Sequence, residues 1–134
     1  MTAPSRGLLD TSVLIATETG RPLDTNALPD EIFISVVTVA ELQAGVLAAA
    51  DTATRARRLA TLDSVAGLEA LPIDIVAAGH WATLRVRLAE EGLRINGNNL
   101  WIAAGAAAND LPIVTQDSDY DPLEAIGGPT VIRV

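Results

Sequence analysis

The sequence contains no cysteine, no lysine and only one histidine. Without cysteine the chain forms neither disulfides nor a thiolate zinc site. A single imidazole, His80, excludes a ribonuclease that uses two, and no nucleophile-elbow glycine pattern accompanies it for a Ser-His-Asp hydrolase. The lack of lysine removes Schiff-base chemistry and the phosphate-binding P-loop, so every cationic side chain of this chain is an arginine.

Long apolar runs are also missing. No stretch approaches the roughly eighteen apolar residues of a membrane span, and residues 1–6 lack the apolar core of a signal peptide. We therefore expect a protein of the cytoplasm. The 134 residues, 49% of them hydrophobic, are enough for one core, and we expect a single domain over residues 1–134.

Carboxylates are what the sequence has in quantity. Seventeen aspartates and glutamates face nine arginines, for a net charge of −8. This charge argues against a general nucleic-acid binder, because phosphate contacts favour a basic surface. It allows an enzyme that meets phosphates through bound metal ions, and it suits a protein that binds a basic segment of a partner.

Short apolar segments alternate with segments of helical periodicity along the whole chain. The expected strands are 7–9, 32–36, 71–73, 111–115 and 130–133, and the expected helices are 13–16, 38–47, 52–65, 74–92 and 100–109. Strands separated by helices favour a parallel sheet with helices on both faces. The predicted fold class is therefore α/β, a three-layer α/β/α arrangement around a central parallel sheet.

Two carboxylates follow expected strands, Asp10 after the first and Asp117 after the fourth. In parallel α/β sheets, binding sites lie beyond the carboxyl ends of the strands. Without lysine or paired histidines, hydrolysis of a phosphodiester depends on metal ions, and Mg²⁺ or Mn²⁺ prefers oxygen ligands. Such a metal acidifies a water and stabilises the charge that develops on the phosphate.

Four segments resemble the four sequence motifs of the PIN-domain family, in the order and spacing of that family. They are residues 8–15, 39–45, 98–104 and 113–120, and together they span nearly the whole chain. Each motif alone is a weak signal, whereas the set of four is specific. The resemblance implies the PIN-like version of the three-layer fold.

On this resemblance the catalytic residues are Asp10, Glu41, Asn99 and Asp117. The implied metal ligands, for Mg²⁺ or Mn²⁺, are Asp10, Asp117, Asn99 and Asp119. Of the two acids in the fourth motif, Asp117 is assigned to the site first and Asp119 second.

The chain length resembles that of VapC-type PIN proteins, the toxins of type II toxin–antitoxin systems. The resemblance implies a metal-dependent endoribonuclease that cuts structured RNA, tRNA or rRNA. It also implies a VapB-like antitoxin as partner, a homodimer, and a heterotetramer or larger assembly with the antitoxin. The acidic charge leads us to expect an antitoxin tail that bears arginine.

Asn99 departs from the family pattern, which has an aspartate at this position. An amide carries no negative charge and offers a metal only its carbonyl oxygen, so metal affinity and rate should both fall. Two origins are open: a naturally weakened enzyme, or a deliberate Asp→Asn change, which the intact remaining motifs favour. The alternative function is a catalytically silent PIN domain that binds an antitoxin or RNA. A signalling receiver domain is disfavoured, because it needs a lysine near its acids.

Each motif residue also has a purely structural interpretation. Asp10 can cap the following helix, and Thr38 with Glu41 forms a potential capping box. Asn98 is expected to cap the helix that follows it, and Asp121 is expected to act in a turn. Only the company of the other motifs favours catalysis at these positions.

Several further side chains receive provisional roles. Thr115 and Ser12 are candidates to orient the ligands. His80 is expected to lie on the surface or to pack, and Trp81 and Trp101 are expected in the core or an interface. The arginines are expected to lie on solvated helix faces. A minority interpretation lets some of them hold RNA phosphates, and the candidates are Arg55, Arg57, Arg58, Arg85, Arg87 and Arg94.

Overall fold

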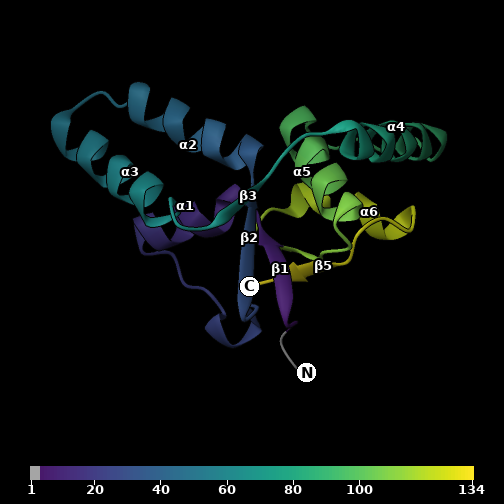
Figure 1. Ribbon diagram of the computed structural model, residues 1–134, viewed down its shortest axis with the longest axis horizontal. Helices are drawn as coiled ribbons and strands as arrows, with labels where there is room; N and C mark the ends of the chain where they lie inside the picture. Colours follow the sequence, from purple (N-terminus) through teal and green to yellow (C-terminus); the bar gives the residue numbers. More distant parts are fainter. Residues whose placement is uncertain (1–3) are drawn as a thin grey trace.

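The computed structural model describes residues 4–134 and is built around one five-stranded parallel sheet (Figure 1). Part of the segment in which a signal peptide was sought, residues 1–3, lies outside the described residues. The strands are β1 (Arg6–Leu9), β2 (Glu31–Ser35), β3 (Glu69–Leu71), β4 (Ile113–Thr115) and β5 (Val131–Arg133). Their order in the sheet is β3-β2-β1-β4-β5, and every neighbouring pair is parallel.

Helices cover both faces of the sheet, which confirms the predicted three-layer fold (Figure 1). One group is α1 (Thr11–Thr19), α2 (Val36–Leu47) and α3 (Thr52–Ser64), and the other is α4 (Ile75–Glu90), α5 (Gly97–Ala108) and α6 (Pro122–Ala125). Two 3₁₀ turns, η1 (Thr25–Ala27) and η2 (Ser118–Tyr120), complete the described elements. We call α2 with α3 the arm, because these two helices extend away from the sheet.

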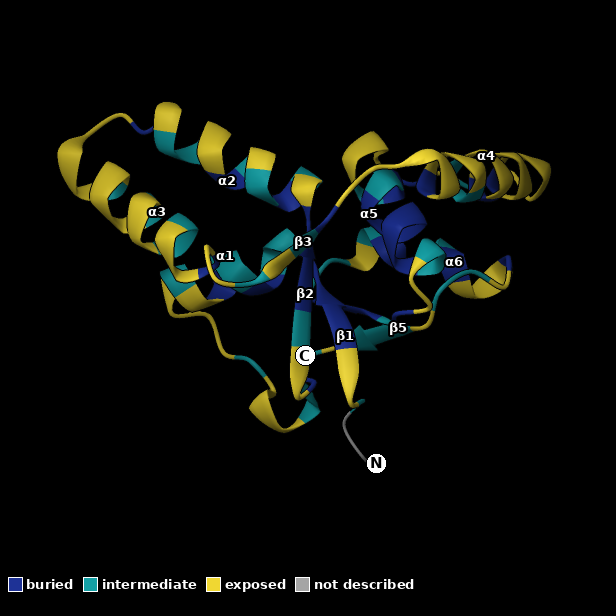
Figure 2. Ribbon diagram, in the orientation of Figure 1, coloured by how far each residue is buried: buried dark blue, intermediate teal, exposed yellow. Residues whose placement is uncertain are grey.

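The strands feed two hydrophobic clusters, one on each face of the sheet. Successive side chains of a strand point to opposite faces, so Leu8 joins the cluster under α4 and α5 while Leu9 joins the cluster under α1 and α2. Ile113 and Val114 divide in the same way. The carboxyl-terminal parts of β1 and β2 are buried, whereas β5 at the sheet edge is only partly buried (Figure 2). None of the helices described for residues 4–134 has the length and apolar character of a membrane span.

Several element boundaries differ from the expected ones for local reasons. Helix α2 begins at Val36 because the Ser35 hydroxyl accepts the Val37 N–H at 3.0 Å, so the capping box at Thr38 and Glu41 was wrong. Helix α5 begins at Gly97 with Asn96 as its cap, not Asn98.

Prolines account for the boundary differences of β3 and β4. Strand β3 ends at Leu71, before Pro72, and β4 begins only after Pro112, because proline has no N–H to donate to a sheet. The short helix α6 was not expected from the sequence, and Pro122 occupies its first turn.

The strand order reverses between β1 and β4. Chain connections run from β1 through β2 to β3 on one side, and the later strands β4 and β5 lie on the other. In open parallel sheets such a switch point opens a crevice at the carboxyl ends of the two strands. Asp10 follows β1 and Asp117 follows β4, so the fold brings both acids to this crevice.

Candidate active site

Asp10 is the most enclosed acid of the site. It follows β1, caps α1, and is only 2% exposed. Its Oδ1 accepts the Tyr120 hydroxyl at 2.8 Å, and its Oδ2 accepts the Thr115 hydroxyl at 2.9 Å and the Ser12 N–H at 3.3 Å. A buried carboxylate is tolerated when such donors replace water. Asp10 therefore caps α1 and also contacts residues that end or follow β4.

A chain of hydroxyls joins the ends of β1 and β4. The Thr115 hydrogen is given to Asp10, so the Ser12 hydroxyl, 3.2 Å away, donates to Thr115 Oγ1. Ser12 Oγ accepts the Gln116 N–H at 3.0 Å, and Thr115 Oγ1 accepts the Asp117 N–H at 2.8 Å. Ser12 and Thr115 thus lie where the sequence expectation put them, beside the acids.

Glu41 reaches the site from α2. Its Oε1 accepts the Thr11 hydroxyl at 2.9 Å. The hydroxyls of Thr11 and Thr38 lie 2.9 Å apart, and because Thr11 gives its hydrogen to Glu41, Thr38 donates to Thr11. Thr38 is therefore a buried polar residue inside α2 that supports the site, instead of the helix cap that its spacing predicted.

Asn99 lies on the first turns of α5 and faces the two acids that follow β4. Its Nδ2 donates to Asp117 Oδ2 at 3.2 Å and to Asp119 Oδ2 at 2.8 Å. Asp119 Oδ2 also accepts the Asn96 N–H at 2.9 Å, and Asp117 Oδ1 accepts the Asp119 N–H at 2.9 Å. One amide therefore bridges both candidates for the fourth acid.

The buried Tyr120 hydroxyl donates to Asp10 and lies within the field of two further carboxylates. Burial raises the pKa of this phenol well above its ordinary value, and the charge of Asp10 raises it further. Glu41 and Asp117 also raise this pKa, so carboxylates from β1, α2 and the end of β4 all act on one buried hydroxyl. The phenol stays protonated at every ordinary pH and remains a donor to Asp10.

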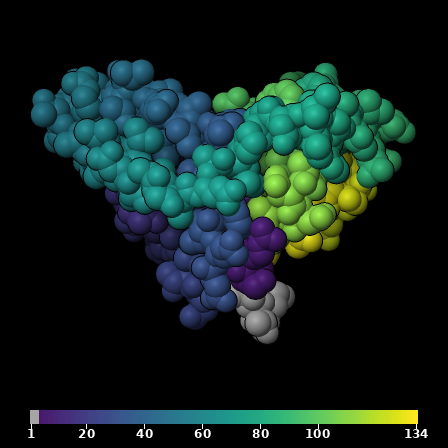
Figure 3. Space-filling view, viewed as in Figure 1, coloured from purple at the N-terminus to yellow at the C-terminus, as the bar shows by residue number. Residues whose placement is uncertain are grey.

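The acidic side chains and Asn99 come from elements on both sides of a hollow in the surface. In the space-filling view the surface is hollowed between the arm and the side formed by α4 and α5 (Figure 3). Glu41 belongs to α2 on one border, and Asn99 belongs to α5 on the other. Both side chains are only partly buried, as are Asp117 and Asp119, so they remain accessible from solvent.

Sequence reasoning missed three side chains that hold the acids: Tyr120, Thr11 and Thr38. Tyr120 was the detectable one, since it follows directly on the acids of the fourth motif and is the chain's only tyrosine. A tyrosine that is fully buried needs a partner for its hydroxyl. The partner lies 110 residues away in sequence, so spacing alone gives no indication that it is Asp10.

The donor set fits a hard divalent cation in kind, because it consists of oxygen atoms. Asp10, Asn99 through Oδ1, Asp117 and Asp119 are the residues that would hold such an ion. Within residues 4–134, however, no three acidic or histidine side chains are placed to hold a metal by themselves. The amide at position 99 supplies neither the charge nor the second oxygen of a carboxylate.

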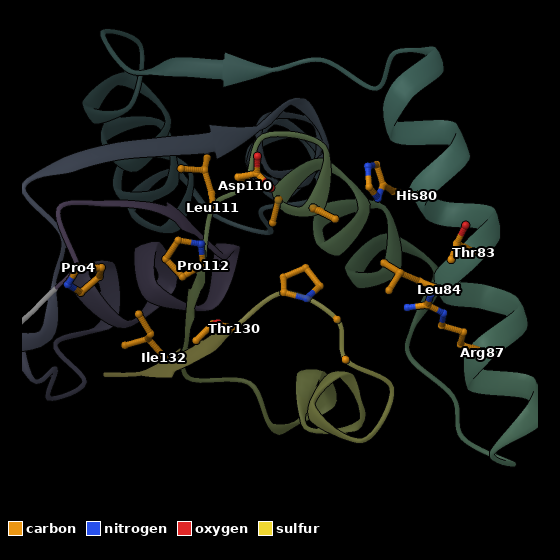
Figure 4. A pocket seen from close by; sticks show the side chains of 15 residues that line it. Pro4, His80, Thr83, Leu84, Arg87, Asp110, Leu111, Pro112, Thr130 and Ile132 are labelled. Carbon is orange, nitrogen blue, oxygen red and sulfur yellow. The ribbon is translucent and has the colours of Figure 1, made fainter.

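A separate pocket, of about 700 Å³, is lined by none of the acids of the site (Figure 4). Its lining includes Pro112 and Thr130, which precede β4 and β5, so it opens at the amino ends of these strands. The only histidine, His80, lines it from α4 together with Arg87. His80 therefore lies outside the acidic site.

Comparison with known proteins gives consistent matches over the whole chain. The model of the PIN domain family matches residues 7–126. Ribonuclease VapC5 of Mycobacterium tuberculosis is 56% identical over 133 residues, which are 99% of this chain and 98% of VapC5. Ribonuclease VapC4 of the same species is 42% identical over 115 residues, 86% of this chain and 88% of VapC4.

Solved structures show the same likeness. The crystal structure of VapBC-5 from Mycobacterium tuberculosis, a member of the VapBC family of toxin–antitoxin systems, matches this fold with a TM-score of 0.91. The two sequences are 53% identical, and the match covers 98% of this chain and 100% of that one.

Proposed function

The chain belongs to the PIN-domain family, among the VapC ribonucleases, and we propose that it is the toxin endoribonuclease of a VapBC-type pair. Its substrate is structured RNA, tRNA or rRNA, and its reaction is the Mg²⁺- or Mn²⁺-dependent hydrolysis of a phosphodiester. Asn99 weakens the metal site of this form.

The observation that carries this proposal is the convergence of acids at the switch point between β1 and β4. Asp10 and Asp117, 107 residues apart, are joined through the Thr115 hydroxyl, and Glu41 is held by the hydroxyl of Thr11, the chain neighbour of Asp10. Ordinary helix caps and turn acids do not gather in this way. The PIN-domain family model matches residues 7–126, a range that contains all four motif segments, and this supports the same assignment.

Each side chain has a task in the proposed reaction. Asp10 is held on both oxygens by hydroxyl donors and presents a fixed negative charge at the floor of the site. Glu41, whose Oε1 is held by the Thr11 hydroxyl, would accept a proton from an attacking water at its other oxygen, Oε2. Asp117 completes the oxygen-lined edge, and a bound Mg²⁺ or Mn²⁺ would supply an acidified water and offset the charge on the phosphate.

Replacement of Asn99 by aspartate is the direct test of the proposal. The Asn99→Asp chain should cut cellular RNA in the presence of Mn²⁺ or Mg²⁺ at a rate roughly 10- to 100-fold above that of the native chain. The physical reason is that a second oxygen and a negative charge replace an amide that donates to Asp117 and Asp119. Cleavage is followed on labelled RNA with and without EDTA.

The matched control is the double variant Asn99→Asp with Asp10→Asn, which keeps the aspartate at position 99 but removes the negative charge of Asp10. It should cut no faster than the native chain. If the folded Asn99→Asp chain neither cuts RNA nor slows the growth of a host without antitoxin, the nuclease assignment is wrong.

The partners of the proposed toxin follow from the same family. A VapB-like antitoxin with an arginine-bearing tail fits the net charge of −8. The proposed assembly is a homodimer that forms a heterotetramer or larger complex with the antitoxin in the cytoplasm. Size determination of the toxin alone and with co-expressed antitoxin tests this arrangement.

A second candidate function is a catalytically silent PIN domain that occupies an antitoxin or RNA without cutting it. The Asn99 amide favours it, because this amide already satisfies both acids after β4 with hydrogen bonds from the chain itself. An Asn99→Asp chain that binds Mn²⁺ and RNA but does not cleave would support the silent module over the enzyme.

A further inference from the structure

Most arginines of this chain are engaged with the chain's own groups. Five of the nine contact acceptors within the described residues: Arg6, Arg55, Arg58, Arg87 and Arg133. A sixth, Arg57, lies close enough to Asp51 for its charge to lower the pKa of that carboxyl. A polyanionic substrate that approaches a chain of net charge −8 needs cations that are not already paired.

Arg85 and Arg94 are two such cations, and they line the same pocket. Within residues 4–134 neither guanidinium makes a hydrogen bond or an ion pair, and both residues are exposed. The pocket has a volume of about 590 Å³ and lies between α4, the loop of residues 92–96 and the start of α5. We call it the α4–α5 pocket.

The α4–α5 pocket adjoins the acidic site. Its lining includes Ile95 and Gly97, which flank Asn96 in the chain. The Asn96 N–H donates to Asp119 Oδ2 at 2.9 Å, so the loop that carries Arg94 is joined to one of the acids. The pocket therefore lies on the side of the acids from which a bound strand would continue.

One wall of the pocket is rigid and aromatic. Trp81 stacks on Trp101 with ring centroids 5.0 Å apart and an angle of 20° between the planes. Trp81, which is partly exposed, contributes apolar surface against which a ribose or base can pack, while the two arginines that line the pocket are exposed. Among the described residues, the 700 Å³ pocket at the amino ends of β4 and β5 lacks such a free arginine beside an aromatic wall, because its Arg87 donates to the Ile126 carbonyl oxygen.

We propose that the α4–α5 pocket is a subsite for the RNA strand that flanks the scissile phosphodiester, with Arg85 and Arg94 holding its backbone phosphates. This subsite rests on the proposed function, since it places the substrate of that reaction. Phosphate contacts position a strand without reading its sequence, so the subsite sets affinity and register and not base preference.

Equilibrium binding of RNA to the native chain in EDTA tests the subsite without cleavage. The probe is a 5′-labelled single-stranded RNA of mixed sequence and about 12 nucleotides, followed by fluorescence anisotropy. Arg85→Gln and Arg94→Gln should each weaken binding about 3- to 10-fold and lower the slope of log K against log salt by about 0.7, the value for one lost phosphate contact on a single strand.

Arg21→Gln is the matched control, because it removes the same charge from a guanidinium that also lacks a partner within residues 4–134 but lines none of the described pockets. It should change affinity less than about twofold. Arg85→Lys and Arg94→Lys should restore the salt slope, since a lysine keeps the charge. Both arginines are exposed, so thermal unfolding should remain that of the native chain.

Three results would overturn the subsite: no measurable RNA binding by the native chain, losses no larger than that of Arg21→Gln, or an altered oligomeric state with an unchanged salt slope. The last result would identify the pocket as a contact between copies. If the Asn99→Asp chain cleaves RNA but the arginine variants bind RNA as the native chain does, the subsite is refuted and the nuclease assignment is kept. If the arginine variants lose RNA binding but the Asn99→Asp chain does not cleave, the nuclease assignment is refuted and the RNA-binding pocket is kept.

Discussion

Asp10 on the β1 side of the switch point is 2% exposed, and its carboxylate receives two hydroxyls and a backbone N–H. On the β4 side, Asp117 and Asp119 are only partly buried and share the amide of Asn99. Asp10 is held by the Thr115 and Tyr120 hydroxyls and the Ser12 N–H, which the packing of the sheet places beside it. The pair on the β4 side also accepts the N–H groups of Asn96 and Asp119, but Asn99 is the one side chain among the described residues that donates to it.

This difference separates a structural requirement from a chemical one. Tyr120 and Thr115 are fully buried, so the donors of Asp10 are part of the core and change only with the fold. Asn99 lies near the start of a helix, and one substitution there replaces a donor by an acceptor. We therefore expect the β1 side to dominate stability and the β4 side to dominate the response to metal.

Tyr120→Phe should produce the largest loss of stability, because it keeps the ring but leaves a buried carboxylate oxygen without its donor. Hydrogen bonds to charged groups contribute about 1.5–3 kcal/mol, and we expect a loss of unfolding free energy in this range. Urea denaturation at neutral pH measures it. A loss below that of Asn99→Asp would contradict the proposed division between the two sides.

Asn99→Asp should cost about 1–2 kcal/mol in the absence of divalent ions, since it removes two hydrogen bonds and adds a third negative charge beside Asp117 and Asp119. Millimolar Mn²⁺ should restore the loss by binding to the folded state. Thermal unfolding with Mn²⁺ and with EDTA measures both effects. Equal unfolding of the variant in the two buffers would mean that position 99 has no part in metal binding.

Asp119→Asn should have a smaller effect, of about 0.5–1 kcal/mol. The carboxylate accepts from Asn99 and from the Asn96 N–H, but an amide oxygen can replace it as acceptor and the site is partly exposed to water. Urea denaturation of this variant, in parallel with Tyr120→Phe, ranks the two sides directly. A larger loss at position 119 than at position 120 would reverse the comparison.

Asp51→Ala should have the smallest effect, because this acid caps α3 in the exposed arm, away from both sides of the site. Hydrogen bonds from Thr54 hold the pKa of the Asp51 carboxyl below its ordinary value of 3.8. A lowered folded-state pKa stabilises the native chain above that value, and the contribution is lost as the pH falls below it. The difference in melting temperature between native and variant chains should therefore shrink in acid and stay constant near neutrality.

The sequence predicted the alternation of strands and helices well because apolar periodicity reports which face of an element is buried. It located helix starts poorly at Ser35 and Asn96, where a residue that caps and a residue that merely looks capable of capping stand close together. Cap choice depends on where the preceding strand or loop ends, and that is set by packing. The short helix at Pro122 was missed for a different reason, because four residues are too few to show apolar periodicity.

Local sequence determined the elements of this protein, the placement of Asp10 and Asp117 after strands, and the exclusion of histidine and lysine chemistry, because these follow from residue type and periodicity. Only the tertiary structure decided that Tyr120 donates to Asp10, that Thr38 supports Glu41 through Thr11, and that Asn99 bridges two acids. Such contacts join residues 18 to 110 positions apart in the chain. They exist only once the order β3-β2-β1-β4-β5 has brought the carboxyl ends of β2, β1 and β4 side by side.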